Sequence, residues 1–169
     1  NRTDDAEGVL KYSTELVSLD DTAANRLFQI QSLTNAGLSE EAAKKLEAFE
    51  ERYPRDNRAM VFEASLKTRQ GQYDAALQLL NRTLQNTEGN ASAWRLRGQL
   101  HYLKGNYAQA ISDLQQSKSI QPSTEVRIEL AKVYRRAKRV EDAIAELRAA
   151  LDSDDTSREA RVMLESLYR

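Results

Sequence analysis

The sequence contains no cysteine, and this absence removes several classes of site at once. A chain without cysteine has no disulfide framework, no cysteine-based zinc site and no thiol nucleophile. Its longest uninterrupted apolar run, Ala59–Phe62, has four residues, whereas a membrane-spanning helix needs about 18 or more. We therefore expect a soluble chain without membrane insertion, and the sequence leaves the compartment open between the cytoplasm and a bacterial periplasm.

An excess of charge of one sign is also missing. Lys+Arg number 25 and Asp+Glu 26, which gives a formal net charge of -1. Because nucleic-acid-binding domains are usually strongly basic, this balance argues against a nucleic-acid partner. The 2 prolines and 6 glycines fall below the usual shares of about 5% and 7%. A chain with few turn-forming residues favours long helices joined by short connections.

The scarce residues recur at a fixed interval. Successive glycines lie 34 residues apart at Gly37, Gly71 and Gly105. An alanine follows each glycine five residues later, and a fourth alanine follows 33 residues after the third: Ala42, Ala76, Ala110 and Ala143. A period of about 20 to 50 residues is typical of arrays in which one structural unit is repeated.

The apolar spacing inside each period is helical. After the first glycine, Ala42, Leu46 and Phe49 recur at intervals of four and three, and a second amphipathic stretch precedes each glycine. Each period therefore predicts two helices, with glycine in a left-handed conformation after the first helix and alanine where the two helices approach closely. Lys138 stands at the glycine position of the fourth copy, so we expect a looser corner or a different turn there.

In this order the residues resemble the tetratricopeptide repeat, a helix–turn–helix unit of about 34 residues. The third copy carries the family pattern most fully, in the residues Trp94, Gly98, Gly105, Tyr107, Ala110 and Pro122. Within this copy two positions depart from the pattern, because Arg97 stands where Leu is common and His101 where Tyr is common; in the first copy Ser39 stands two residues after Gly37, where an aromatic is common. The resemblance implies an all-α, right-handed solenoid of about ten helices.

The resemblance also divides the chain. Four repeats are expected at 23–56, 57–90, 91–123 and 124–157. Residues 1–22 are interpreted as the second helix of a preceding repeat and residues 158–169 as the first helix of a following one, with native caps as the alternative. Because the chain begins with Asn1 and not Met, we interpret it as a processed product or a fragment of a longer protein. Open end helices would expose apolar surface, so self-association through them is expected.

The search for a catalytic or metal site gives no candidate. The single histidine, His101, occupies a core position of a first helix with no triad partner. Carboxylate pairs such as Glu40 and Glu41 are adjacent at helix starts, so they would not flank a substrate as an acid and a base must. The stretch 152–159 lacks the turn glycine and the ligand spacing of a calcium loop. We predict no enzymatic activity, no cofactor and no metal.

The family resemblance places function on a surface. In tetratricopeptide arrays the first helices line a concave groove that holds a partner peptide, chiefly through five positions of each repeat. At these positions the candidate groove residues are Gln31, Asn35, Arg58, Arg69, Arg95, Gln99, Tyr102, Lys132, Arg135 and Arg136. Because basic side chains predominate, an acidic peptide or loop is the expected partner. The alternative is that long basic side chains simply solvate exposed helix faces.

One peptide-binding pattern of the family is absent. Tetratricopeptide domains that clamp the acidic C-termini of heat-shock chaperones use lysine, asparagine and arginine at five fixed positions. In one register these positions hold Leu27, Gln31, Phe62, Ser92 and Leu96. In the next register they hold Val61, Ser65, Leu96, Glu125 and Glu129. Neither set makes the clamp.

The sequence therefore predicts a non-catalytic protein-interaction scaffold that binds a peptide or loop of a partner protein in the groove. Two alternatives stay open. The array could be a structural spacer or self-assembly module whose ends stack, or it could be the regulatory segment of a multidomain enzyme whose catalytic domain lies elsewhere in the parent chain.

Overall fold

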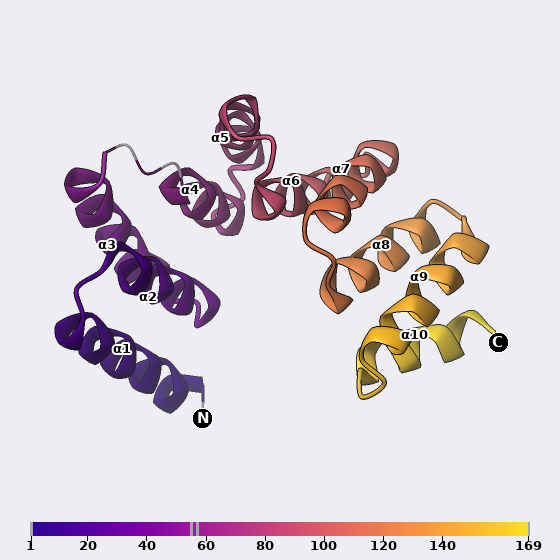
Figure 1. Cartoon of the computed structure of the whole chain (residues 1–169), viewed down its shortest axis with the longest axis horizontal. Helices are drawn as coiled ribbons and strands as arrows, with labels where there is room; N and C mark the ends of the chain where they lie inside the picture. The colour runs from indigo at the N-terminus through magenta and orange to yellow at the C-terminus, as the bar shows by residue number, and fades with distance from the viewer. Residues whose placement is uncertain (1, 55, 57, 169) are drawn as a thin grey trace. The chain divides into compact units, whose positions relative to one another are not determined.

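The computed structural model describes residues 2–54, 56 and 58–168, with the side chains of the first helix described from Glu7 onward. Within these residues the chain forms ten α-helices and no strand (Figure 1), which confirms the all-α prediction. The helices are α1 (Arg2–Leu19), α2 (Ala23–Asn35), α3 (Ser39–Arg52), α4 (Arg58–Arg69), α5 (Tyr73–Asn86), α6 (Ala91–Leu103), α7 (Tyr107–Ile120), α8 (Thr124–Arg136), α9 (Val140–Ser153) and α10 (Arg158–Leu167).

Short polar side chains begin four of these helices. Each accepts a hydrogen bond from the backbone N–H three residues further on, and the four residues are Thr22, Asn90, Ser123 and Ser157. The first N–H groups of a helix have no partner inside the helix, so each such cap stabilises it by about 1 kcal/mol. Local chemistry therefore sets where α2, α6, α8 and α10 start.

The turn inside each helix pair needs one residue in the left-handed conformation. Three glycines occupy this place with φ between 75° and 82°: Gly37, Gly71 and Gly105. Lys138 adopts the same conformation with φ 60°, and the next N–H, of Arg139, donates to the carbonyl of Tyr134 at 2.9 Å. The expectation of a different turn at the fourth copy is therefore wrong. The hydrogen-bonded turn holds the lysine in a conformation that ordinarily favours glycine.

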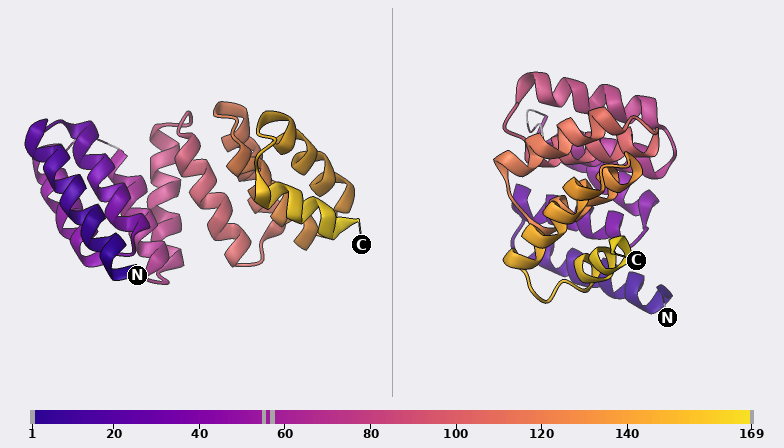
Figure 2. Two further views of the ribbon diagram at one scale, coloured as in Figure 1. Left: turned by 90° about the horizontal axis from the view of Figure 1, so that it is seen from below. Right: turned by 90° about the vertical axis from the view of Figure 1, so that its right-hand side faces the viewer.

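The helices separate into two compact units, Asn1–Leu79 and Leu80–Arg169. In the first unit α2 packs against α1, α3 and α4, and Figure 2 shows α1, α2 and α3 side by side. Its core is Leu27, Ile30, Leu33, Ala42, Leu46, Phe49, Ala59 and Leu66. The division between the units falls within α5, inside the predicted repeat 57–90, and the exact repeat boundaries stay a prediction.

The second unit contains the end of α5 and the helices α6 to α10. Successive helices pack on one another from α6 to α10, around a core that includes Leu114, Val126, Leu130 and Leu147. Close approach between α6 and α7 depends on Gly98, because a Cβ atom there would lie 2.8 Å from Cγ of Leu114. Gly98 and Ala110, which belong to the repeat pattern of the third copy, therefore allow the backbones of α6 and α7 to pack closely.

Candidate functional site

In the first unit the predicted groove residues are polar, and most of them bind one another or a near neighbour. On α2 the amide of Gln31 donates to Oδ1 of Asn35 at 2.9 Å. Arg58, at the start of α4, donates to both carboxylate oxygens of Asp56, with its closest contact at 2.5 Å. This contact is the main cause of the lowered pKa of Asp56. Arg69 is exposed at the end of α4.

In the second unit an ion pair joins α6 to α8. Arg95 donates from Nη2 to Oε1 of Glu129 at 2.6 Å and from Nε to the same carboxylate at 3.0 Å. The amide of Gln99 donates to Oε1 of Glu129 at 2.8 Å. Hydrogen bonding to Glu129 raises the pKa of Arg95. A two-point guanidinium–carboxylate contact is among the stronger ion pairs, so the charge of Arg95 is neutralised by a carboxylate of the same chain.

Sequence reasoning missed Glu129 because it lies outside the five groove positions of its repeat. The separation of 34 residues between Arg95 and Glu129 equals one repeat period, which would have been the signal for side-by-side placement. Lys132 is also paired, with its Nζ 2.7 Å from Oε1 of Glu159 on α10. Both of these side chains are well exposed, so this second pair contributes less than about 1 kcal/mol and opens easily.

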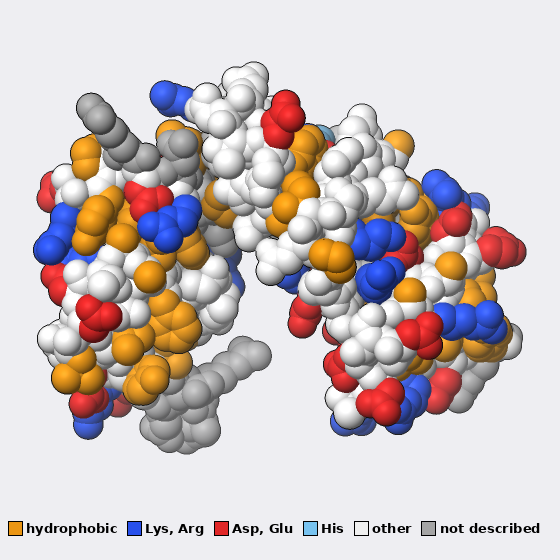
Figure 3. Space-filling view, viewed as in Figure 1, with side chains coloured by type: hydrophobic (Ala, Val, Ile, Leu, Met, Phe, Trp, Pro, Cys, Tyr) orange, Lys and Arg blue, Asp and Glu red, His pale blue; other side chains and the backbone are white. Residues whose placement is uncertain are grey.

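The last turns of α6 and α8 carry four residues that we call the α6–α8 corner: Tyr102, Leu103, Arg135 and Arg136. The rings of Tyr102 and Tyr107 are 6.0 Å apart, and Tyr102 packs against the buried core. Interaction with the hydroxyl of Tyr102 is the main cause of the raised pKa of Arg136. Leu103 is 56% exposed. Figure 3 shows Lys and Arg side chains over α8, with hydrophobic side chains beside them.

The two departures from the repeat pattern of the third copy meet in a second, more buried cluster. Arg97 donates from Nε and Nη2 to the two carboxylate oxygens of Asp113, each at 2.8 Å, and from Nη1 to Oδ1 of Asn81 at 2.8 Å. The guanidinium carbon lies 4.6 Å from the ring centroid of Trp94. Asp113 is only 4% exposed. The cluster therefore ties α5, α6 and α7 together through one arginine.

His101 borders this cluster. Its Nε2 lies 3.8 Å from Oδ2 of Asp113, while its buried Nδ1 has no hydrogen-bond partner among the residues described. Burial is the main cause of its lowered pKa; the negative charge of Asp113 raises the pKa, and Arg97 and Lys104 lower it further. The histidine therefore tends to stay neutral, as a packed side chain would.

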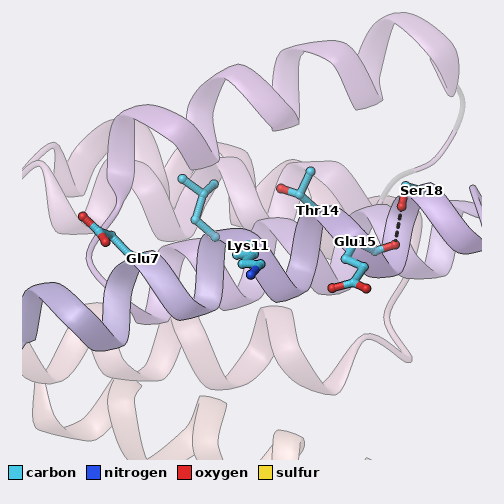
Figure 4. Close-up of a pocket in the computed structure, with 6 residues that line it drawn as sticks. Glu7, Lys11, Thr14, Glu15 and Ser18 are labelled. Atoms are coloured by element: carbon cyan, nitrogen blue, oxygen red, sulfur yellow. Dashed lines mark hydrogen bonds between the residues drawn. The ribbon is translucent and has the colours of Figure 1, made fainter.

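Described residues of the first unit line two hollows of interest. One runs along a face of α1 and is lined by Glu7, Leu10, Lys11, Thr14, Glu15 and Ser18 (Figure 4). Its lining comes from one helix, and the hydroxyl of Ser18 donates to the backbone of Glu15 at 2.7 Å. The other lies between α3 and α4 beside Glu47, Glu50 and Glu63. Burial raises the pKa of Glu50, with the two neighbouring carboxylates adding to it.

The described part of the chain contains no group of three or more histidine, aspartate or glutamate residues that could hold a metal ion. Among the helices that the structure describes, none is both long enough and apolar enough to cross a membrane.

Two family models match the sequence. A model described as a tetratricopeptide repeat matches residues 29–91, and a model described as anaphase-promoting complex, cyclosome, subunit 3 matches residues 69–150. No curated protein sequence matches the chain.

Several solved structures share the fold. A thermophilic tetratricopeptide repeat protein of Thermus thermophilus is 17% identical, covers 96% of this chain and 98% of its own, and has a TM-score of 0.77. A chain of the APC/C hetero-tetramer Cut9–Hcn1 is 18% identical, with the match covering 88% of this chain and 30% of that chain, and the TM-score is 0.76. The first tetratricopeptide domain of Spaghetti (RPAP3), bound to the HSP90 peptide SRMEEVD, is 16% identical over 68% of this chain and 91% of that chain, with a TM-score of 0.64.

Proposed function

Because this chain is a tetratricopeptide repeat protein, we propose that it is a non-catalytic scaffold that binds a peptide or loop of a partner protein along its first helices. Tetratricopeptide repeats generally mediate protein–protein interactions, and their fold is typically non-catalytic. One solved neighbour of the same fold holds a bound peptide. A fold does not by itself fix a function, so the proposal must rest on the side chains of the first helices.

The observation that carries the proposal is the arrangement of polar side chains on α6 and α8. Gln99 and Arg95 both donate to Glu129, so three side chains from two neighbouring first helices are held in one geometry. Such fixed groups lose little conformational freedom when a partner binds, which favours recognition. The α6–α8 corner adds exposed apolar and cationic groups at the end of the same helices.

The peptide of the RPAP3 complex is not the expected ligand. The five positions that make the chaperone clamp hold no lysine and no arginine in either register of this sequence. In one register they include Phe62 and Leu96, and in the other they include Glu129, which is already bound to Arg95. A partner must therefore be recognised by other contacts than those of the clamp.

The proposal is tested by selecting binders and locating them on the chain. We would select peptides of about twelve residues from a random display library against the full chain. A photoreactive amino acid at position 99 on α6 would then report contact with the first helices. The matched control carries the same group at position 116 on α7, where Gln116 is exposed on a second helix.

Selected peptides are expected to cross-link at position 99 and not at position 116. Equal cross-linking at both positions, or a selection that yields no binder, would contradict the proposal. Arg95→Glu is not a clean test of the groove, because the new carboxylate would face Glu129 and disturb the packing of α6 on α8.

A second candidate function, self-association, is favoured by apolar side chains on the end helices. Tyr12 on α1 is 64% exposed and Val162 on α10 is 55% exposed. Exposed apolar groups of this kind often mark contact surfaces. Sedimentation velocity over a concentration series should show association that weakens in Tyr12→Ser/Val162→Ser, whereas Val140→Ser on α9 serves as the control. A concentration-independent monomer would exclude this function.

A further inference from the structure

Among the candidate groove cations of α6 and α8, those that form no ion pair within the described chain lie in the last turn of α8. Four candidate groove cations lie on α6 and α8, and two of them, Arg95 and Lys132, face carboxylates of this chain at 2.6 and 2.7 Å. Arg135 and Arg136 form no ion pair with any residue in the described ranges. Of these four cations, Arg135 and Arg136 are therefore the two whose charge is not already paired with a carboxylate among the described residues.

The last turn of α6 carries apolar groups. Tyr102 is half-buried against the core and touches the ring of Tyr107, so its position is fixed, and the next residue, Leu103, is 56% exposed. Interaction with the hydroxyl of Tyr102 raises the pKa of Arg136, so the two side chains are neighbours. A guanidinium has five N–H donors, so this contact leaves donors for a carboxylate. Cations in the last turn of a helix also interact with its dipole, which explains their position but not the neighbouring exposed leucine.

From this charge complementarity, and resting on the proposed function, we infer that the α6–α8 corner binds an internal partner segment in which acidic side chains flank an apolar side chain. The carboxylates pair with Arg135 and Arg136, and the apolar side chain packs on Leu103 and Tyr102. Guanidinium groups bind carboxylates through two parallel hydrogen bonds, and apolar anchors beside such pairs commonly dominate recognition. None of the four corner residues occupies a position of the chaperone clamp.

The test uses three peptides whose ends are acetylated and amidated, so that only side chains carry charge. Their central sequences are EDFLDE, QNFLNQ and KRFLRK, each with an N-terminal fluorophore. Fluorescence anisotropy measures binding to the full chain at about 50 mM and about 150 mM salt, because exposed charge pairs weaken as the screening length shortens. Hydrogen exchange of the bound complex locates the protected backbone.

We expect EDFLDE to bind at least tenfold more tightly than QNFLNQ, which corresponds to about 1.4 kcal/mol, and KRFLRK not to bind. The double variant Arg135→Gln/Arg136→Gln should lose at least tenfold in affinity for EDFLDE, and Leu103→Ser should lose severalfold. The matched control, Lys44→Gln/Lys45→Gln on α3, removes the same charge and should change affinity less than twofold. Circular dichroism should show unchanged helicity in all variants.

Equal binding of EDFLDE and QNFLNQ would overturn the inference, as would full affinity in the arginine double variant. Protection outside the C-terminal turns of α6 and α8 would overturn it too. These results leave the proposed function standing, since that rests on display selection and cross-linking at position 99. If the arginine variant loses helicity, the salt dependence of the unaltered chain and Leu103→Ser decide the matter instead.

Discussion

The substitution Gly98→Ala probes the contact between α6 and α7 most directly. A Cβ atom at this position would lie 2.8 Å from Cγ and 3.2 Å from Cδ2 of Leu114, and 3.3 Å from the carbonyl oxygen of Ala110. Leu114 is 1% exposed and Ala110 is fully buried, so neither can move into solvent. The added methyl group must push α6 away from α7 or force Leu114 from its packed position.

Two opposing terms set the size of the effect. Overpacking a close-packed core costs about 1 to 3 kcal/mol. Replacing glycine by alanine inside a helix stabilises it by about 1 kcal/mol. We therefore expect Gly98→Ala to lower the free energy of unfolding of the second unit by up to about 2 kcal/mol.

A matched control separates the effect of helix propensity from the effect of overpacking. Gly8 is also inside a helix, α1, but a Cβ atom there would meet nothing within 4 Å. Gly8→Ala should therefore show the helix term alone and stabilise α1 by up to about 1 kcal/mol. Because neighbouring repeats can unfold separately, the measurement is native-state hydrogen exchange of the amides of α6 and α7 for one variant and of α1 and α2 for the other, with urea unfolding of the whole chain alongside.

We expect the free energy of unfolding to fall in Gly98→Ala and to rise in Gly8→Ala. If Gly98→Ala stabilised α6 and α7 as much as Gly8→Ala stabilises α1, the close approach of α6 to Leu114 would be refuted. The register assigned to the third helix pair would then be wrong.

Three further predictions concern single residues. Lys138→Gly should stabilise the chain by about 0.5 to 1 kcal/mol, since glycine adopts the left-handed conformation without steric strain; a lower melting temperature would contradict this. Arg97→Met should destabilise by about 3 kcal/mol by leaving Asp113 buried without its partner, and Arg97→Met/Asp113→Leu should recover most of the loss in urea unfolding. The pKa of His101 is lowered from 6.5 in the folded chain, so the unfolded chain binds protons more readily. Stability should therefore fall as the pH drops below about 6.5, and His101→Gln should reduce this slope in urea midpoints measured between pH 7.5 and 5.

The repeat period, the all-α fold and the turn glycines could be predicted because each depends on neighbours in sequence. The left-handed position after a first helix favours glycine, and a short polar side chain can cap a helix by accepting a hydrogen bond from the N–H three residues further on. The same local logic failed at Lys138, where the hydrogen bonds of the turn hold a residue that local preference disfavours.

The candidate groove residues stay a prediction, and the sequence alone overstated their free charge. Family positions placed Arg95 and Lys132 on the first helices, but they gave no account of Glu129 and Glu159, which neutralise them. Counting charges along the chain treats every cation as available. Only packing shows which ones face a carboxylate.

Pairing between helices was decided by the tertiary structure alone. The carboxylate of Glu146 on α9 lies 2.5 Å from Nζ of Lys118 on α7 and 3.1 Å from Nη1 of Arg127 on α8. The carboxylate of Asp113 on α7 forms an ion pair with Arg97 on α6. A helix presents side chains around its whole circumference, and a small rotation or shift against its neighbour changes which of them meet. The sequence period sets where helices begin and end. The rotation and spacing that bring distant charges within hydrogen-bonding distance come from the filling of the core between the helices.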